Sequence, residues 1–350
     1  MTTESDPRSL ATICFQGTIL GFIILAAIMG NTLILTSLYR FTCLQTKTNA
    51  FVLNLAIADL FLAVSAMPFT LATSIKYDWI FGNVMCQVTA VLNSIFCEAS
   101  IMTLAFVSLE RFLAIVYPLE YERMVTSKRV KFVIGFIWSE AIFCASSTFV
   151  FSRFTFLKFE SICTVDWGYK MAYTLLFAIL FFYVPFLVTA VLYCFILHTA
   201  IKQHKRVAAI KVGEIVLDHQ SQKRDKAEQD RVGAKWTKKE HKATIMIAIV
   251  VGTFCVCWIP HSVSVFCLLD SNCQWHDSFF IITTWLAMLN SAMNSIIYGL
   301  MNRSFRRAFK SILFCERYVG NADLVTNILQ ERKEKKSYGN VSSLCYNTER

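Results

Sequence analysis

The sequence predicts an all-α membrane protein, a seven-transmembrane helix bundle with a short amphipathic helix after the last span. Hydrophobic residues make up 55% of the 350-residue chain and its mean hydropathy is +0.50, well above the values of soluble domains. Each of seven apolar runs reaches the length of about 20 residues that a bilayer requires. They lie near residues 12–38, 49–74, 85–117, 130–151, 170–198, 243–268 and 278–301.

Basic residues predict the orientation of the spans. The segments after spans one, three, five and seven are rich in Lys and Arg, whereas the opposite segments hold only Arg8, Lys76, Arg153, Lys158 and Lys170. The positive-inside rule therefore makes residues 1–11 an extracellular N-terminus and puts the C-terminus in the cytoplasm. The net charge of +10 follows from this topology and from attraction to anionic membrane lipid, so no nucleic-acid partner is implied.

The cytoplasmic segments differ in composition. Cytoplasmic loop 3, about residues 205–238, has mixed charge and is expected to form helical extensions around a flexible middle. Residues 303–315 read as an amphipathic juxtamembrane helix that ends at Cys315, a candidate for palmitoylation, and 316–350 as a flexible tail.

Two pairs of cysteines fall on the predicted outer side, where disulfides persist. Cys86 and Cys163 form one expected bond, and Cys267 and Cys273, six residues apart across the last outer loop, form the other. Cysteines inside the spans are expected to be small buried apolar residues.

The stretch from residue 86 to residue 119 organises the chain. It carries side chains at three- and four-residue spacing that share one helix face: Asn93, Cys97, Ser100, Leu104, Ser108 and Arg111. Because lipid penalises the polar groups among them, that face must contact other protein.

Every span also carries a short marker. In order these are Gly30 with Asn31, LNLAIAD ending at Asp59, Glu110-Arg111-Phe112, Trp138, Pro185 with Tyr193, CWIP ending at Pro260, and NSIIY from Asn294 to Tyr298. The ordered set resembles the rhodopsin-like (class A) G-protein-coupled receptors over nearly the whole chain. Two departures are Phe112, where Tyr is usual, and Ser295, where Pro is usual; the missing proline removes a built-in kink.

The resemblance implies a receptor that passes the binding of a small extracellular ligand to a heterotrimeric G protein by rearranging helices 3, 5, 6 and 7, with arrestin and a receptor kinase as further partners. An enzyme is not expected, because no nucleophile–base pair or metal cluster shows the necessary spacing. A transporter is not expected either, because internal repeats and broken half-helices are missing from the sequence.

Polar residues at mid-membrane depth suggest an ion site. An ionised carboxylate such as Asp59 costs about 2.5 to 3.5 kcal/mol there unless it has partners. The resemblance places Asn31 and the following groups around it, and implies that they hold an allosteric sodium ion: Ser100, Asn290, Ser291 and Asn294. The alternative is a purely structural hydrogen-bond network.

The inner half of the chain carries the expected activation switch. Arg111 has two carboxylate candidates, Glu110 and Glu240, and the resemblance makes Arg111 and Glu240 a latch between spans three and six. The alternative for Glu240 is a solvated side chain at the membrane edge.

Between this latch and the ligand pocket lies an apolar set expected to repack on activation: Ile101, Pro185 and Phe254. The resemblance implies that Tyr193 and Tyr298 then turn toward Arg111. It also makes Leu119, together with Arg111, a contact for the G protein.

The ligand is constrained mainly by what is missing. Amine receptors place an aspartate where this chain has Asn93, which cannot neutralise a buried cation. Retinal needs a lysine where this chain has Met288. The remaining candidates suit a small, uncharged or amphipathic ligand, and they are Asn93, Cys97, Phe177, Phe181, Trp258, His261, Trp285 and Met288.

Two residues keep open roles. His261 either binds a ligand or satisfies a backbone group, and Glu98 either is protonated and structural or reads a cationic ligand in place of Asn93. The alternatives at the level of function are an opsin-related or amine-receptor-related protein with altered ligand chemistry, and a receptor without a ligand that signals constitutively or acts as a scaffold.

Overall fold

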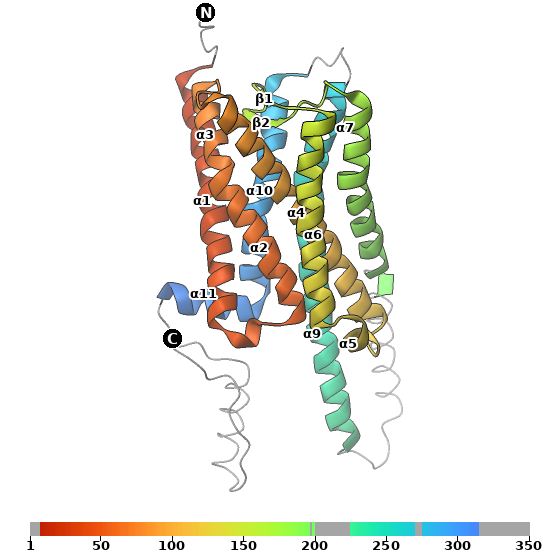
Figure 1. The fold of residues 1–350 in the computed structure, drawn as a ribbon. Helices are drawn as coiled ribbons and strands as arrows, with labels where there is room; N and C mark the ends of the chain where they lie inside the picture. Colours follow the sequence, from red (N-terminus) through yellow and green to blue (C-terminus); the bar gives the residue numbers. More distant parts are fainter. Residues whose placement is uncertain (1–7, 197, 200–224, 270–274, 315–350) are drawn as a thin grey trace, which may run out of the picture.

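The computed structural model describes residues 8–196, 198–199, 225–269 and 275–314, with the backbone alone for 225–244, 247 and 269. Seven of its helices are long and apolar enough to cross a membrane, and they stand side by side as one bundle (Figure 1). The predicted seven-transmembrane fold class is therefore confirmed.

The helices α1 (Leu10–Arg40), α4 (Gly82–Val116), α6 (Ser127–Phe151) and α10 (Asp277–Met301) each form one span. Short elements join them at the predicted inner end: the 3-10 turn η1 (Thr42–Leu44) and α5 (Tyr121–Met124). Several helices begin at a side chain that accepts a backbone N–H, for example Thr46 from Asn49 and Thr126 from Arg129. These caps satisfy donors that the first helical turn leaves unpaired.

The second span is broken, which differs from the single run predicted over residues 49–74. It consists of α2 (Lys47–Ser65) and α3 (Met67–Lys76), joined at Ala66. Pro68 stands in the first turn of α3, where it lacks an N–H and its ring would clash with a preceding carbonyl of a continuous helix. The break redirects the outer end of this span.

The fifth span is irregular for a similar reason. Helix α7 (Met171–Phe177) leads into the π-helical turn η2 (Ala178–Tyr183), and the span continues to Ile196. Pro185 follows this turn and cannot donate the usual helical hydrogen bond, so the widened turn accommodates it.

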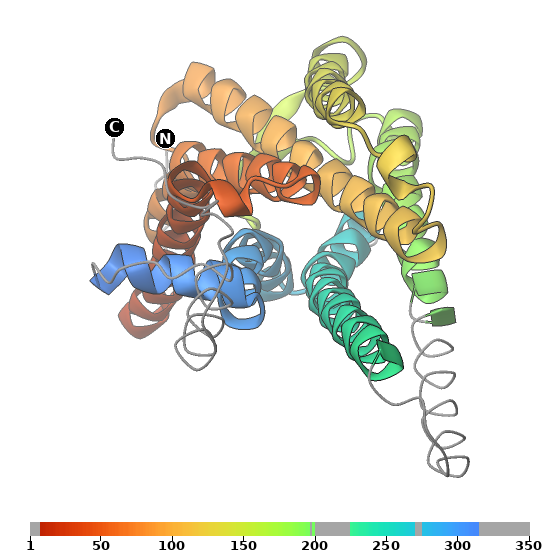
Figure 2. The ribbon, with the colours of Figure 1, turned by 90° about the horizontal axis from the view of Figure 1, so that it is seen from below.

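The sixth span belongs to α9 (Asp225–Leu269), which begins well before the apolar segment Ala248–Leu268. Part of the predicted loop 3 is therefore helical. After α10, the amphipathic helix α11 (Arg303–Phe314) turns away from the bundle axis and lies across the ends of α1 and α10 (Figure 2). It buries Phe305 and Ala308 against Ile34, Leu38 and Tyr298.

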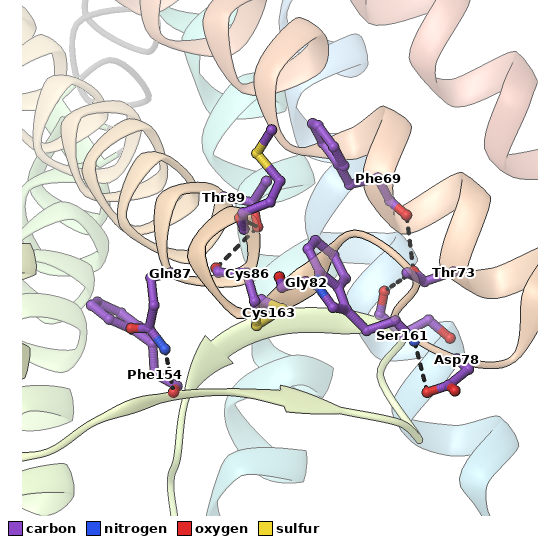
Figure 3. Close-up of a disulfide and its surroundings, with 12 residues drawn as sticks. Phe69, Thr73, Asp78, Gly82, Cys86, Gln87, Thr89, Phe154, Ser161 and Cys163 are labelled. Atoms are coloured by element: carbon purple, nitrogen blue, oxygen red, sulfur yellow. Dashed lines mark hydrogen bonds between the residues drawn. A yellow bond between two sulfur atoms is a disulfide. The ribbon is translucent and has the colours of Figure 1, made fainter.

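A β-hairpin covers the predicted outer end, and sequence reasoning did not identify it as strands. Strands β1 (Phe154–Leu157) and β2 (Ile162–Val165) pair antiparallel, with Phe156 opposite Cys163. Cys163 forms the predicted disulfide to Cys86 of α4, with 5.4 Å between the Cα atoms. Figure 3 shows two supporting hydrogen bonds, from Gln87 Nε2 to Phe154 O at 3.1 Å and from Thr73 Oγ1 to Ser161 O at 2.6 Å.

Close packing of α1 on α10 depends on Gly30. A Cβ at this position would lie 1.9 Å from Ser295 Oγ and 2.7 Å from Ser295 Cβ, so α10 approaches because the side chain is missing. Ser295 Oγ instead donates to Ala292 O at 2.8 Å, a contact within the helix that often bends helices. Helix α10 is continuous through this position, from Asp277 to Met301.

Candidate functional site

A cavity of about 130 Å³ lies beneath the β-hairpin and between α4, the fifth span, α9 and α10. Strand β2 contributes Ile162, Thr164 and Val165 to its wall, and Trp167 follows from the next loop. The disulfide between Cys86 and Cys163 holds this wall on α4. An apolar cavity of about 150 Å³ can hold benzene, so a space of about 130 Å³ is close to the size of one aromatic ring.

Most of the ligand candidates chosen from the sequence lie around this one cavity. Its lining includes Asn93, Cys97, Phe177, Phe181, Trp258, His261 and Met288. They come from α4, the fifth span, α9 and α10, so residues nearly two hundred positions apart in the chain face the same space.

Trp285, the remaining ligand candidate, is not among the residues that line the cavity. It is 8% exposed and belongs to a buried cluster that contains Leu20 of α1, Ala63 of α2 and the cavity residue Met288. Trp285 precedes Met288 by three positions, which offsets it by roughly 60° around an α-helix.

The cavity also contains residues that the sequence reasoning left out of the pocket. Glu98, Cys144, Phe182 and Thr284 line it. Thr284 stands four positions before Met288 on one helix face, so the helical repeat could have identified it. Cys144 belongs to α6, and only the packing of α6 on α4 brings it to the cavity.

Several polar atoms at the cavity wall have no hydrogen-bond partner among the described residues. They are Glu98 Oε1, Trp167 Nε1, Trp258 Nε1, His261 Nδ1 and Thr284 Oγ1. Buried polar groups without partners are rare in proteins, and they mark positions where a bound molecule can supply the missing bond. For His261, this favours a ligand contact over a purely local bond for Nδ1.

A column of rings leads from the cavity floor toward the predicted inner end. Trp258 lies 6.1 Å from Phe254, and Phe254 lies 5.9 Å from Phe186, between ring centroids. Phe254 and Ile101 belong to one buried cluster with Leu104, and Pro185 is buried beside Phe186 in the fifth span. The predicted activation residues are thus packed without a polar break below the cavity.

Asp59 is fully buried where α2, α4 and α10 meet. Its Oδ1 accepts from Ser100 Oγ at 3.1 Å and its Oδ2 from Asn294 Nδ2 at 2.9 Å. Ser291 also hydrogen-bonds to Asp59, and Asn31 Nδ2 donates to the Ser291 carbonyl at 3.0 Å.

Asn290 completes this group of candidate residues. It is buried one turn from Asn294, and its Oδ1 has no partner among the described residues. A carboxylate, hydroxyls and a spare amide oxygen are the hard donors that a small cation prefers, so the chemistry of the residues fits a sodium ion.

At the inner end, Arg111 forms a two-point ion pair with its neighbour Glu110. The distances are 2.6 Å from Arg111 Nε to Glu110 Oε2 and 2.7 Å from Nη2 to Oε1. Thr48 of α2 and Tyr121 of α5 also donate to Glu110. Burial, and then the bond to Glu110, raise the pKa of Tyr121 to about 12, so its hydroxyl remains a donor at neutral pH.

The two tyrosines of the predicted switch are close to this ion pair. Tyr193 and Tyr298 are both buried and both interact electrostatically with Arg111. The ring of Tyr298 packs on Phe305 of α11 at 5.7 Å between centroids. Leu119 is 98% exposed in the turn between α4 and α5, where a partner can reach it.

Some predicted residues lie outside what the structure describes. The side chain of Glu240 is among them, although its backbone is part of α9. Cys273 and Cys315 also lie outside the described residues. Cys267, the expected partner of Cys273, is disulfide-bonded.

Known proteins were compared with the whole chain. A family model described as "7 transmembrane receptor (rhodopsin family)" matches residues 30–298. The octopamine receptor beta-1R of Drosophila melanogaster is 32% identical over 92% of this chain and 68% of its own length. Human G-protein coupled receptor 161 is 29% identical over 90% of this chain, and the chain spans 62% of that protein.

Two further proteins extend the comparison. The alpha-1A adrenergic receptor of Oryzias latipes is 28% identical over 85% of this chain and 66% of its own length. The crystal structure of squid rhodopsin superposes with a TM-score of 0.76, covering 96% of this chain and 95% of that one at 22% sequence identity. The last likeness concerns the fold alone.

Proposed function

Because this chain belongs to the rhodopsin family of seven-transmembrane receptors, we propose that it is a G-protein-coupled receptor that reports a small extracellular ligand to a heterotrimeric G protein. The observation that carries the proposal is the continuous packing from cavity to inner ion pair. Trp258 at the cavity packs on Phe254, and the clusters below it extend to Tyr193 and the Arg111 helix.

Signalling in this proposal is a shift between two packings of the inner half. A ligand that fits the cavity better in one packing moves the equilibrium toward it. The ion pair of Arg111 with Glu110, supported by Thr48 and Tyr121, stabilises the resting packing. Release of Arg111 and movement of α9 expose a surface for the G protein, with Leu119 as a further contact.

The remaining partners follow from family membership and sequence. Arrestin and a receptor kinase are expected to act on the tail at 316–350, and Cys315 is proposed to carry a palmitoyl chain beside α11. The protein spans the plasma membrane several times, and we infer an extracellular N-terminus from the distribution of Lys and Arg. The side chain of Glu240 is proposed to join Arg111 in the latch.

A sodium ion is proposed as an allosteric ligand at Asp59. Ser100, Ser291 and Asn294 already point a hydroxyl or amide at the carboxylate, and the unpartnered oxygen of Asn290 supports the assignment. A bound cation would offset the cost of a buried charge in this part of the membrane. Its role is to stabilise the resting packing of α2, α4 and α10.

The proposed coupling to a G protein is tested by replacing Arg111, the central residue of the activation switch. Cells that express the wild type are expected to show ligand-independent activation of at least one G-protein class, measured by energy transfer between labelled G-protein subunits across all classes. The Arg111→Ala variant, at equal surface expression, is expected to lose this signal. Equal signals from wild type and Arg111→Ala would instead favour a scaffold without G-protein coupling.

A further inference from the structure

Two acids on neighbouring spans, Glu98 and Glu140, lie outside both the proposed sodium site and the activation switch. Glu98 of α4 is 6% exposed and lines the cavity, and Glu140 of α6 lies close enough to interact with it electrostatically. Cys144, one turn along α6 from Glu140, interacts with both carboxyl groups and lines the same cavity. The cavity, the Cys144 thiol and Glu98 thus form one site on the α4–α6 side, and Glu140 interacts with it from outside the cavity lining.

This site lies deep. Twelve residues separate Cys86, at the disulfide, from Glu98. At about 1.5 Å per residue this is roughly 18 Å along the helix, near the middle of a hydrocarbon core of about 30 Å. Acids at such depth are costly and are generally tied to function.

The carboxyl oxygens lack protein partners. Glu98 Oε1 and both oxygens of Glu140 are buried and accept no hydrogen bond from the described residues. No Lys or Arg stands among the described lining residues of the cavity, and Glu98 is the one carboxylate there. A counter-charge for this pair therefore has to come from the cavity itself.

Charge repulsion sets the net charge of the pair. Two carboxylates that interact in a dry site do not both ionise readily, because each charge disfavours the other. The favoured state therefore carries at most one negative charge across the two acids. A monovalent cation with N–H donors complements this state, whereas a neutral or anionic group does not.

We propose that Glu98, supported by Glu140, is the binding site for the ammonium group of a small aromatic amine. This inference rests on the proposed receptor function and specifies its ligand class. The amine enters beneath the hairpin, its ring packs among Phe177, Phe181 and Trp258, and its N–H groups donate to Glu98.

The geometry also accounts for the uncharged Asn93. Glu98 follows Asn93 by five positions, so it lies about 7.5 Å deeper along α4. Both residues line the cavity, and the Asn93 amide is close to Cys97, whose thiol lies 3.9 Å from Asn93 Oδ1. The cation-binding position in this chain is therefore the deeper one, and a ligand needs a chain that spans the distance from ring to acid.

The test uses full-length purified receptor in lipid nanodiscs and a defined probe series. Phenylalkylamines from benzylamine to 4-phenylbutylamine are compared with phenylalkanols of equal chain length, and the shift in thermal unfolding midpoint is titrated. At least one amine is expected to raise the wild-type midpoint while its matched alcohol does not. Glu98→Gln, which keeps the shape and loses the charge, is expected to weaken that amine by about tenfold or more.

The control is Glu122→Gln, an acid whose side chain is 78% exposed and lies outside the cavity lining, and it is expected to leave the amine affinity unchanged. A wild type that binds no amine of the series, or binds alcohols equally well, overturns the inference; so does equal amine affinity in Glu98→Gln. The comparison of amines with alcohols needs only the wild type, so it tests the proposed ligand class even if Glu98→Gln fails to fold.

Basal nucleotide exchange on purified G proteins is measured with the same preparation. Exchange without amine binding contradicts the ligand class while leaving the receptor function intact. Amine binding with no G-protein activation contradicts the receptor function while supporting the amine site.

Discussion

Replacing Glu160 by Gln should remove a pH-dependent weakness of the hairpin that covers the cavity. Glu160 lies in the turn between β1 and β2, is fully buried, and neither carboxyl oxygen has a hydrogen-bond partner among the described residues. Burial raises the pKa of Glu160 to about 8. The nearby cation of Lys158 lies over the ring of Tyr77, 4.4 Å from its centroid.

The sign of the effect follows from proton binding. Between pH 4.5 and pH 8 the folded hairpin keeps the Glu160 proton and the unfolded one releases it, so the free energy of unfolding falls as pH rises through this window. The difference between the pKa of 4.5 in the unfolded chain and about 8 in the folded one corresponds to a loss of about 5 kcal/mol across this window. This is an upper bound, because local opening of the loop relieves the cost before the bundle unfolds.

The measurement is the thermal unfolding midpoint of purified receptor from pH 5 to pH 8, followed by tryptophan fluorescence. The wild-type midpoint is expected to fall relative to Glu160→Gln by up to about 10 °C, at about 2 °C for each kcal/mol in a protein of this size. Glu122→Gln is the matched control, since that side chain is 78% exposed. Parallel curves for wild type and Glu160→Gln would show that the Glu160 carboxyl is solvated.

Three further changes test other contacts. Gly30→Ala places a methyl group 1.9 Å from Ser295 Oγ and should lower the thermal unfolding midpoint by several degrees. Adding Ser295→Gly should restore part of this loss. An unchanged midpoint in Gly30→Ala would refute the close approach of α1 to α10. Sodium chloride is expected to raise the wild-type midpoint above that in N-methylglucamine chloride, and Asp59→Asn should abolish this difference; a persistent difference rejects the ion site. Tyr121→Phe removes a donor to Glu110 and should raise basal G-protein activation up to severalfold in the energy-transfer assay, whereas unchanged activation would exclude Tyr121 from the switch.

Much of the architecture follows from the sequence because membranes restrict what a chain can do. A backbone in lipid has to satisfy its own hydrogen bonds, so an apolar run of about 20 residues becomes a helix with little dependence on its neighbours. The predicted topology places Cys86 and Cys163 on the outer side of the membrane, where disulfides persist. This location was sufficient to predict the bond between them. The spacing of Asn93, Cys97 and Ser100 similarly indicated one face of α4 before any packing was known.

The details that shape the site depended on tertiary structure. Trp285 and Met288 are both apolar, three positions apart and in the same buried cluster, and only the folded structure shows that Met288 lines the cavity whereas Trp285 does not. The hairpin over the cavity was missed because four-residue strands carry almost no periodic signal, and their pairing is stabilised by the disulfide and by Thr73.

The fold class, the spans and the polar face of α4 can be predicted from the amino-acid sequence, because each depends on local hydrophobicity and helical periodicity. Which acids interact depends on how the helices pack in the folded protein. Glu98 and Glu140 are 42 positions apart on different helices, and nothing in their local sequences relates them. Packing of α6 on α4 places Glu140 where it interacts electrostatically with Glu98 at the cavity wall, because contacts between helices depend on how whole faces fit.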